Sequence, residues 1–295
     1  MPSTRDIRRR IKSVKNTAQI TKAMQMVAAA KMRKAQQAAL AGRPYADLMN
    51  RMLAEAAPRI AVIKHPLMET RLGRKRGVIL VSTDKGLCGA LNSNLFREAA
   101  KLDRDTTVFI TAGRKAAQFI ARTRRQLTAE FTCKDTPQFG EARAISKFVQ
   151  ELFVNGDVDA VDILFTKFVS TLNQRPELVP LLPVGNIRAL AAGAFGQSLS
   201  EELPPPEATT DVFEFEPDEA TVLGELLPHS LNFMVYQILL EARASEYSAK
   251  LVAMKNATEN AMGLIKDLTL EYNKLRQANI TKELLEIATA QMAVA

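Results

Sequence analysis

The sequence predicts an α/β protein that combines a long antiparallel coiled coil of its N- and C-terminal helices with a Rossmann-like, mainly parallel α/β domain. Both ends of the chain are poor in proline and glycine and repeat their apolar residues every three or four positions. Between them, short apolar runs alternate with helical stretches. We therefore expect an N-terminal coiled-coil helix over residues 1–58, a central α/β domain over residues 72–217 and a C-terminal coiled-coil helix over residues 218–295.

The N-terminal segment, residues 3–56, is rich in Ala, Met, Gln, Lys and Arg, which favour helices. Ser3 or Thr4 can cap its start. Gly42–Pro44 is expected to bend or briefly interrupt the helix, which then continues to Ala57–Pro58. Positions four and three residues apart form a seam of mostly small or polar side chains. This N-terminal seam consists of Ile7, Ile11, Val14, Ala18, Thr21, Gln25, Ala28, Met32, Ala35 and Ala39.

The C-terminal segment gives the stronger helical signal, because it has no proline after His229 and one glycine, Gly263. Its seam keeps alternating spacings of four and three, with one clearly polar member, Thr258. The C-terminal seam consists of Leu240, Ala244, Tyr247, Leu251, Met254, Thr258, Ala261, Ile265, Leu268, Tyr272 and Leu275. Such a repeat predicts a left-handed supercoil with a partner helix.

The central segment changes to a mixed strand and helix pattern. Apolar runs predict strands over residues 77–82, 106–111 and 158–168, and an edge strand over residues 211–215. Helical stretches over residues 94–102, 114–125 and 141–155 separate the first three of these strands, and a helix resumes near Asp218. Alternation of this kind predicts a mainly parallel sheet.

The positive charge is concentrated at the N-terminus. The net charge of the chain is +8, but residues 1–34 hold ten Lys and Arg residues and one acid, a net charge of +9. A helix this basic faces nucleic acid, an anionic membrane or an acidic protein surface, or is simply solvated. No stretch resembles a membrane span or a secretory signal, so we expect the protein at the cytoplasmic face of a bacterial membrane.

The loop Asp84-Lys85-Gly86-Leu87-Cys88-Gly89 follows the first predicted strand, where α/β folds place ligands. Its glycines do not have the spacing of a dinucleotide or phosphate loop. We expect them to shape a turn that Asp84 stabilises, and we expect Asn92 or Ser93 to cap the next helix. Cys88 has no histidine nearby in the sequence, so a catalytic nucleophile is not expected.

Cys88 and Cys133 lie in unrelated segments, and His65 and His229 are isolated. This distribution fits neither a zinc site nor a disulfide framework, and we expect two free thiols. No metal, cofactor or catalytic site is therefore predicted for this chain.

Three blocks resemble one family. Residues 7–34 (IRRRIKSVKNTAQITKAMQMVAAAKMRK), 82–95 (STDKGLCGALNSNL) and 272–287 (YNKLRQANITKELLEI) are similar to segments of the gamma subunits of F-type ATP synthases. The resemblance implies a central rotor shaft that couples proton-driven rotation to the catalytic sites of beta. The implied partners are three alpha and three beta subunits, epsilon and a ring of c subunits, through which alone the chain would associate with the membrane.

The resemblance also implies contact residues. Lys22, Met24 and Lys31 would pass an acidic segment of beta, and Arg276, Gln277 and Thr281 would meet another part of beta. Phe215 and Glu216 would lie near the c-ring and epsilon, and residues 281–290 would lie in an apolar sleeve. Two residues depart from the family pattern: Ala290–Gln291 replaces a usual Gly-Ala pair, and Phe215 replaces a common aromatic hydroxyl.

Two other classes of protein remain as alternatives. A nucleic-acid binder could use the basic helix, but it would need stacking aromatic residues nearby, and the first aromatic residue is Tyr45. An α/β enzyme with a helical stalk would need a catalytic constellation, and the sequence contains no recognisable one.

Overall fold

The structure is a computed structural model that describes residues 3–42, 44–45, 48–49, 52, 65–71, 73–184, 216 and 218–294. The chain divides into two compact units, each described by itself below. One unit joins residues 1–28 with residues 250–295, and the other comprises residues 29–249. The three segments expected from the sequence were divided by secondary structure and not by compact units, so their bounds stay a prediction.

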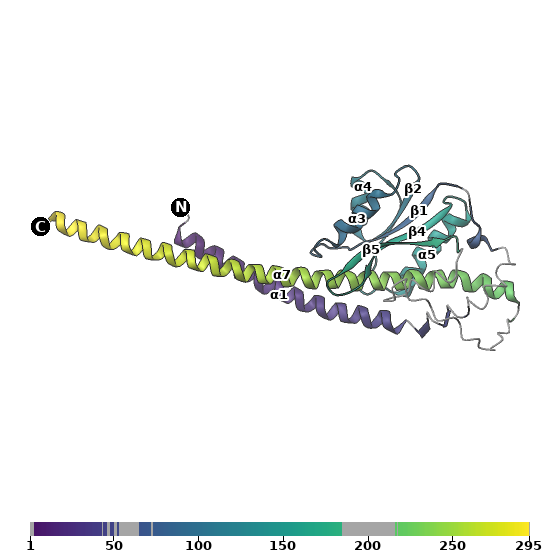
Figure 1. The fold of residues 1–295 in the computed structure, drawn as a ribbon, viewed down its shortest axis with the longest axis horizontal. Helices are drawn as coiled ribbons and strands as arrows, with labels where there is room; N and C mark the ends of the chain where they lie inside the picture. Colours follow the sequence, from purple (N-terminus) through teal and green to yellow (C-terminus); the bar gives the residue numbers. More distant parts are fainter. Residues whose placement is uncertain are drawn as a thin grey trace. The chain divides into compact units, whose positions relative to one another are not determined.

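A five-stranded sheet forms the centre of the second unit (Figure 1). Its strands are β1 (Arg76–Val81), β2 (Thr107–Ala112), β3 (Gln126–Phe131), β4 (Ala160–Phe168) and β5 (Gln174–Leu182). They lie in the order β3-β2-β1-β4-β5, with all neighbours parallel except β4 and β5. The predicted mainly parallel, Rossmann-like sheet is therefore confirmed.

Strands β1, β2 and β4 confirm the three predicted central strands, whereas β3 and β5 were not predicted. Strand β3 lies at one edge with most of its side chains exposed, so it lacks the apolar run that marks a buried strand. Strand β5 contains Pro176 and Pro180, which count against a strand in a sequence pattern. The predicted strand at residues 211–215 lies outside the described residues.

The two prolines are tolerated because β5 is the other edge of the sheet. Pro176 is opposite Thr166 and Pro180 is opposite Asp162. The two prolines are four residues apart, so their backbone nitrogens face the same side of the strand. Since proline has no N–H to donate, such positions suit the outward side of an edge strand. They leave fewer free donors on that edge, which discourages pairing with a further strand.

Helices cover both faces of the sheet (Figure 1). They are α3 (Leu91–Lys101), α4 (Arg114–Arg122) and α5 (Phe139–Val154), close to the predicted helices. On one face, α3 and α4 pack Leu95 and Ile120 against Val78 and Phe109. On the opposite face, α5 and part of the C-terminal helix enclose a larger core. That core includes Ile79, Ile110, Ile163, Ile145, Phe153, Leu231 and Leu239.

The terminal helices are α1 (Thr4–Ala41) and α7 (Glu219–Val294). Ser3 caps α1 as predicted, because its Oγ accepts the N–H of Asp6 at 3.2 Å and donates to the Asp6 carboxylate at 2.7 Å. Helix α1 ends just before the predicted interruption at Gly42–Pro44, and its expected continuation to Pro58 falls mostly outside the described residues. Helix α7 starts at the expected position and continues through Pro228.

The two seams confirm the coiled coil. Every member of both predicted seams is buried or half-buried. The residues at the other positions of the two helices are largely exposed, except where α7 packs into the core of the α/β domain. In the first unit, the hydroxyls of Thr21 and Thr258 lie 2.7 Å apart. In the second unit, Ala35 and Ala39 pack against Leu240 and Ala244. From the first of these contacts to the second, the residue number rises along α1 and falls along α7, so the two helices are antiparallel.

Candidate functional site

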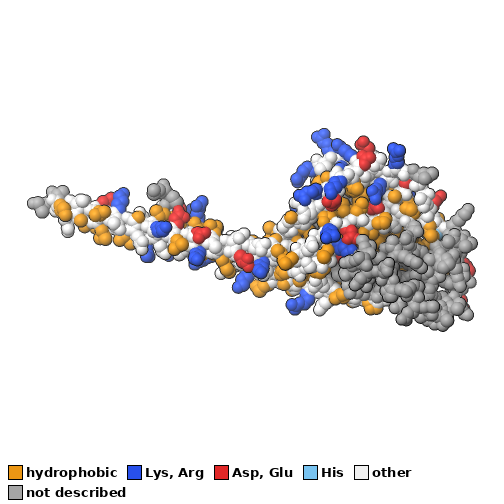
Figure 2. Space-filling view, in the orientation of Figure 1, with side chains coloured by type: hydrophobic (Ala, Val, Ile, Leu, Met, Phe, Trp, Pro, Cys, Tyr) orange, Lys and Arg blue, Asp and Glu red, His pale blue; other side chains and the backbone are white. Residues whose placement is uncertain are grey.

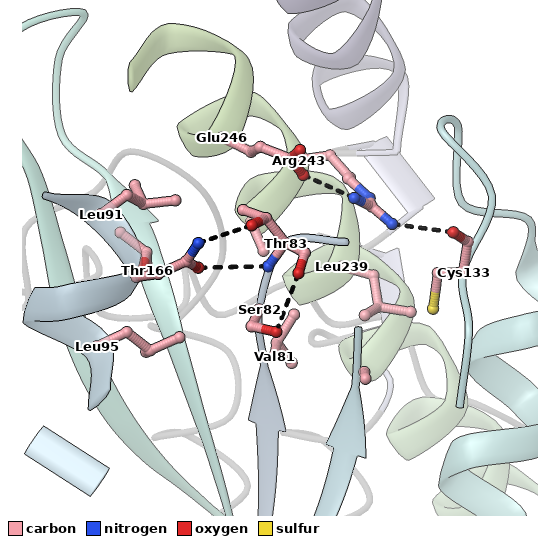
Figure 3. A pocket seen from close by; sticks show the side chains of 13 residues that line it. Val81, Ser82, Thr83, Leu91, Leu95, Cys133, Thr166, Leu239, Arg243 and Glu246 are labelled. Atoms are coloured by element: carbon pink, nitrogen blue, oxygen red, sulfur yellow. Dashed lines mark hydrogen bonds and ion pairs between the residues drawn. The ribbon is translucent and has the colours of Figure 1, made fainter. Parts of the chain in front are cut away.

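Folds of this strand order bind ligands where the chain connections leave in opposite directions, at the carboxyl ends of β1 and β4. The structure has a small cavity there. It is lined by Val81, Ser82, Thr83, Leu91, Asn92, Leu95, Ala112, Cys133, Thr166, Leu239, Ala242, Arg243 and Glu246 (Figure 3). Its volume of about 20 Å³ suits one or two water molecules and is far too small for a nucleotide.

Arg243, a residue of helix α7, fills much of this crevice. Its guanidinium donates to Glu246 Oε2 at 2.6 Å, to Asp84 Oδ2 at 3.1 Å and to the Cys133 carbonyl at 3.0 Å, and Figure 3 shows the contacts to Glu246 and Cys133. Burial by itself disfavours the charged guanidinium, but Glu246 and Asp84 outweigh that effect and raise the pKa of Arg243 above its ordinary value. The chain thus places its own cation where related folds place a ligand.

The loop after β1 connects neighbouring elements. Asp84 Oδ1 accepts the backbone N–H of Arg114 at the start of α4, and its Oδ2 accepts from Arg243. The expectation that Asp84 stabilises its own turn was therefore wrong, because its carboxylate pairs with groups far away in the sequence. Within the turn, the Thr83 hydroxyl instead donates to the Lys85 carbonyl at 2.7 Å.

The glycines of this loop have different roles. Gly89 adopts φ +57°, a left-handed conformation that favours glycine, whereas a Cβ on Gly86 would meet nothing within 4 Å. Lys85 is exposed. A further glycine, Gly113, has φ +111°, and a Cβ there would lie 2.3 Å from the Ser82 carbonyl, so the β2–α4 turn requires glycine. Gly89 therefore shapes a turn, as expected, whereas neither backbone conformation nor space requires glycine at position 86.

The predicted cap of α3 was wrong. The residue before this helix is Ala90, with no side-chain cap. The Asn92 side chain instead reaches back, donating to the Thr83 hydroxyl at 2.7 Å and to Cys88 Sγ at 3.4 Å. Because Asn92 is the second residue of α3, its amide can fasten the loop to the start of the helix.

Both cysteines are buried free thiols. Burial raises the pKa of Cys133 to about 11, which disfavours a nucleophilic thiolate. His65 caps a short 3₁₀ helix, η1 (Pro66–Met68), by accepting the Leu67 N–H, and burial lowers its pKa. His229 Nε2 lies 2.6 Å from the Tyr45 hydroxyl. Among the described residues, no three His, Cys, Asp or Glu side chains are grouped so that they could hold a metal ion.

The residues expected to contact beta lie on the terminal helices. Lys22 and Met24 are exposed on α1. Lys31 is half-buried, and its ammonium lies 2.5 Å from Asp135 Oδ2 and 5.5 Å from the centre of the Tyr247 ring. Lys31 is therefore engaged within the chain as well as partly open to solvent.

Helix α7 changes character after its seam ends at Leu275. All residues from Arg276 to Met292 are exposed, including Gln277 and Thr281. Five large apolar side chains in this stretch are between 48% and 80% exposed: Ile280, Leu284, Leu285, Ile287 and Met292. This end of the helix presents apolar surface that α1 does not cover. Of the predicted residues near the c-ring, Glu216 is exposed, whereas Phe215 lies outside the described residues.

A second basic surface was missed in the sequence. Residues 85–125 contain nine Lys and Arg residues against three Asp and Glu residues, a net charge of +6. Figure 2 shows blue side chains gathered over the part of the second unit formed by α3 and α4. The net charge of all residues after position 34 is close to zero, because acids elsewhere in the chain cancel the positive charge of this region. A count in a sliding window would have found it.

Within the described residues, no helix combines the length and apolar character needed to cross a membrane. The fold and the filled crevice define a coiled-coil protein with a Rossmann-like domain inserted between its helices.

The chain matches the family described as ATP synthase over residues 3–294. It is 50% identical over 296 residues to the ATP synthase gamma chain of Opitutus terrae and 44% identical over 299 residues to that of Methylacidiphilum infernorum, covering all of each chain. The chain therefore belongs to the family of ATP synthase gamma chains.

Solved structures share the fold. A chain of the Euglena gracilis mitochondrial ATP synthase, in a structure of OSCP, F1 and c-ring, aligns with a TM-score of 0.66 at 20% identity, covering 99% of this chain and 94% of that chain. A chain from the central stalk and c-ring structure of Tetrahymena thermophila mitochondrial ATP synthase aligns at 0.60 and 23% identity, covering 81% and 99%. At these identities the likeness shows the fold.

Proposed function

We propose that this protein is the central rotor shaft of an F-type ATP synthase, coupling proton-driven rotation of a c-ring to the catalytic sites of beta. The observation that carries the proposal is the end of α7. There the coiled-coil seam stops at Leu275 and the helix continues with exposed apolar residues. Exposed apolar surface of this kind marks an interaction site. An apolar sleeve formed by a ring of partner subunits would cover it.

The stiffness and asymmetry of the fold support the same role. Two helices that share a buried seam resist bending and twisting more than one helix does. Their outward residues differ from side to side, since α1 is strongly basic along its first 34 residues. Turning such an element inside a ring of fixed subunits presents each of them with a different surface in turn.

For the contacts themselves, we infer that Lys22, Met24 and Lys31 on α1 meet one segment of beta. Arg276, Gln277 and Thr281 on α7 would meet another, and exposed Arg276 can act as a donor to partner acids. Phe215 and Glu216 would lie near the c-ring and epsilon.

The proposed partners are three alpha subunits, three beta subunits, epsilon and the c-ring. The chain would lie at the cytoplasmic face of a bacterial inner membrane, held there by these partners. It would carry no catalytic site of its own. The filled crevice beside Arg243 and the buried thiol of Cys133, whose pKa is raised, support this part of the proposal.

Reconstitution tests the proposal directly. The purified chain should hydrolyse no ATP, and mixing it with alpha and beta should yield a complex with one copy of this chain per three beta, measured by native mass spectrometry. Several copies per complex, or no association, would contradict the proposal.

A matched pair of variants tests the end of α7. Leu284→Ser should weaken association with the alpha–beta ring by roughly tenfold, because burying a leucine contributes about 1.5–3 kcal/mol. Leu172→Ser removes a leucine in the turn between β4 and β5 that is even more exposed, 83% against 62% for Leu284, and should leave association unchanged. Equal effects of the two variants would contradict a specific sleeve around the tip.

A further inference from the structure

The loop between β3 and α5, residues 132–138, contacts both terminal helices within the second unit. On the α7 side, Arg243 donates to the Cys133 carbonyl at 3.0 Å and the Tyr247 hydroxyl lies 3.5 Å from the Asp135 carbonyl. On the α1 side, Lys31 Nζ lies 2.5 Å from Asp135 Oδ2. This single loop of the α/β domain therefore holds a polar contact to each helix.

The two helices are attached to the α/β domain in different ways. Helix α7 contributes Leu227, Leu231 and Leu239 to the main core beneath the sheet, so apolar packing already fixes it. Helix α1 packs Ala35 and Ala39 on α7 residues, with Phe168 of β4 at the edge of that cluster. Small side chains of this kind bury little apolar area, so they contribute less to the attachment than large ones would. The Lys31–Asp135 pair adds a directional contact to the domain itself.

The pair is built to stay charged. The hydrogen bond with Asp135 raises the pKa of Lys31, and the same bond lowers the pKa of Asp135. Tyr247 adds a ring face to the ammonium at 5.5 Å, a favourable arrangement for a cation. Lys31 is thus held between a carboxylate of the domain and an aromatic ring of α7.

We propose that residues 132–138 are a clasp that fixes helix α1 to the α/β domain, with Asp135 as the positioning residue for Lys31. This inference rests on the proposed rotor function, because a joint between the domain and its helices must resist torque only in a rotor. The clasp contributes to the torsional stiffness of the shaft and restricts the positions from which Lys31 can meet a partner.

Single-molecule measurement on the assembled enzyme tests the clasp. A bead is attached through Gln118→Cys, an exposed position on α4, since the two native thiols are buried. With ATP hydrolysis inhibited, the angular variance of the bead reports the torsional stiffness. Asp135→Asn and Lys31→Gln should each raise the variance by about twofold, because each removes the ion pair that joins the loop to α1 and the variance is inverse to the stiffness.

The reversed pair Lys31→Asp with Asp135→Lys supplies the decisive readout. It should return the variance to the wild-type value, since the ion pair is restored with its ends exchanged. Glu98→Gln is the matched control: it removes the exposed Lys101–Glu98 pair of α3, which does not involve the terminal helices, and should change nothing.

Two results would overturn the clasp. Unchanged variance in the single variants would show that the loop bears no load. Raised variance that the reversed pair does not restore would show that Lys31 acts through a partner subunit instead. Failure of the wild-type chain to assemble or rotate would count against the proposed function, and it is distinguishable from both results.

Discussion

Replacing Arg243 with methionine tests whether the filled crevice stabilises the α/β domain. The change keeps an unbranched side chain of similar reach and removes the guanidinium. Arg243 and Glu246 are only 8% and 5% exposed, so water cannot replace the lost contact easily. Breaking a buried ion pair from one side costs about 3–5 kcal/mol, and we expect the lower part of that range because Asp84 is 24% exposed and can be partly hydrated.

The geometry also predicts how lysine behaves at this position. The guanidinium reaches three acceptors in different directions, at 2.6, 3.0 and 3.1 Å. An ammonium keeps the charge but cannot reproduce that fork, so Arg243→Lys should cost about 1–2 kcal/mol. The order wild type, lysine, methionine in free energy of unfolding is therefore expected.

Urea unfolding of the full chain, followed by circular dichroism, measures these free energies. Amide hydrogen exchange in β1 supplies a probe confined to the α/β domain. A double-mutant cycle with Glu246→Gln should give a coupling energy above about 1 kcal/mol, since the two side chains are in direct contact. A loss below about 1 kcal/mol for Arg243→Met, or additive effects in the cycle, would refute the reasoning.

Further predictions concern one ion pair, one hydroxyl pair and one thiol. Arg76→Met should cost about 3 kcal/mol in urea unfolding because it strands the 4% exposed side chain of Asp162, whereas Asp162→Asn should cost under about 1 kcal/mol because Arg76 is 42% exposed. Burial raises the pKa of Asp162 above 3.8, so its contribution to stability should fall as pH rises through the folded-state pKa, a dependence that Asp162→Asn abolishes in pH titrations of unfolding. Thr21→Val or Thr258→Val alone should cost about 1 kcal/mol in thermal unfolding, whereas the double variant should cost clearly less than the sum of the two, because the same hydrogen bond between the hydroxyls is lost in all three variants. Alkylation of Cys133 by iodoacetamide at pH 8, followed by mass spectrometry, should be roughly a hundredfold slower than in the unfolded chain, because its pKa is about 11 instead of 9.0.

The seams and the central strands could be predicted because burial leaves a periodic trace in the sequence. The alternation of four and three from Leu240 to Leu275 is set by the contact of two helices and needs no knowledge of the rest. Strands β1 and β4 are buried on both faces and therefore read as apolar runs.

Edge strands and long-range pairs leave no such trace. Strand β3 is exposed, and β5 contains two prolines that only an edge position explains. The partners of Asp84 were missed because Arg114 and Arg243 lie 30 and 159 residues away, and only the folded chain brings them to the same loop. Lys31 could be placed on a basic helix, but its pairing with Asp135 across 104 residues could not be read from local spacing.

The position of α7 at the end of the chain has a consequence for synthesis. The core of the α/β domain includes Leu227, Leu231 and Leu239, which leave the ribosome after all five strands. Neither the core of the domain nor the coiled coil can therefore close until synthesis has passed Leu239. During that time the residues of α1 have no partner helix. From Ala18 to Ala39, the seam of α1 consists of alanine, threonine and glutamine, with one methionine. These side chains offer little apolar surface to neighbouring nascent chains.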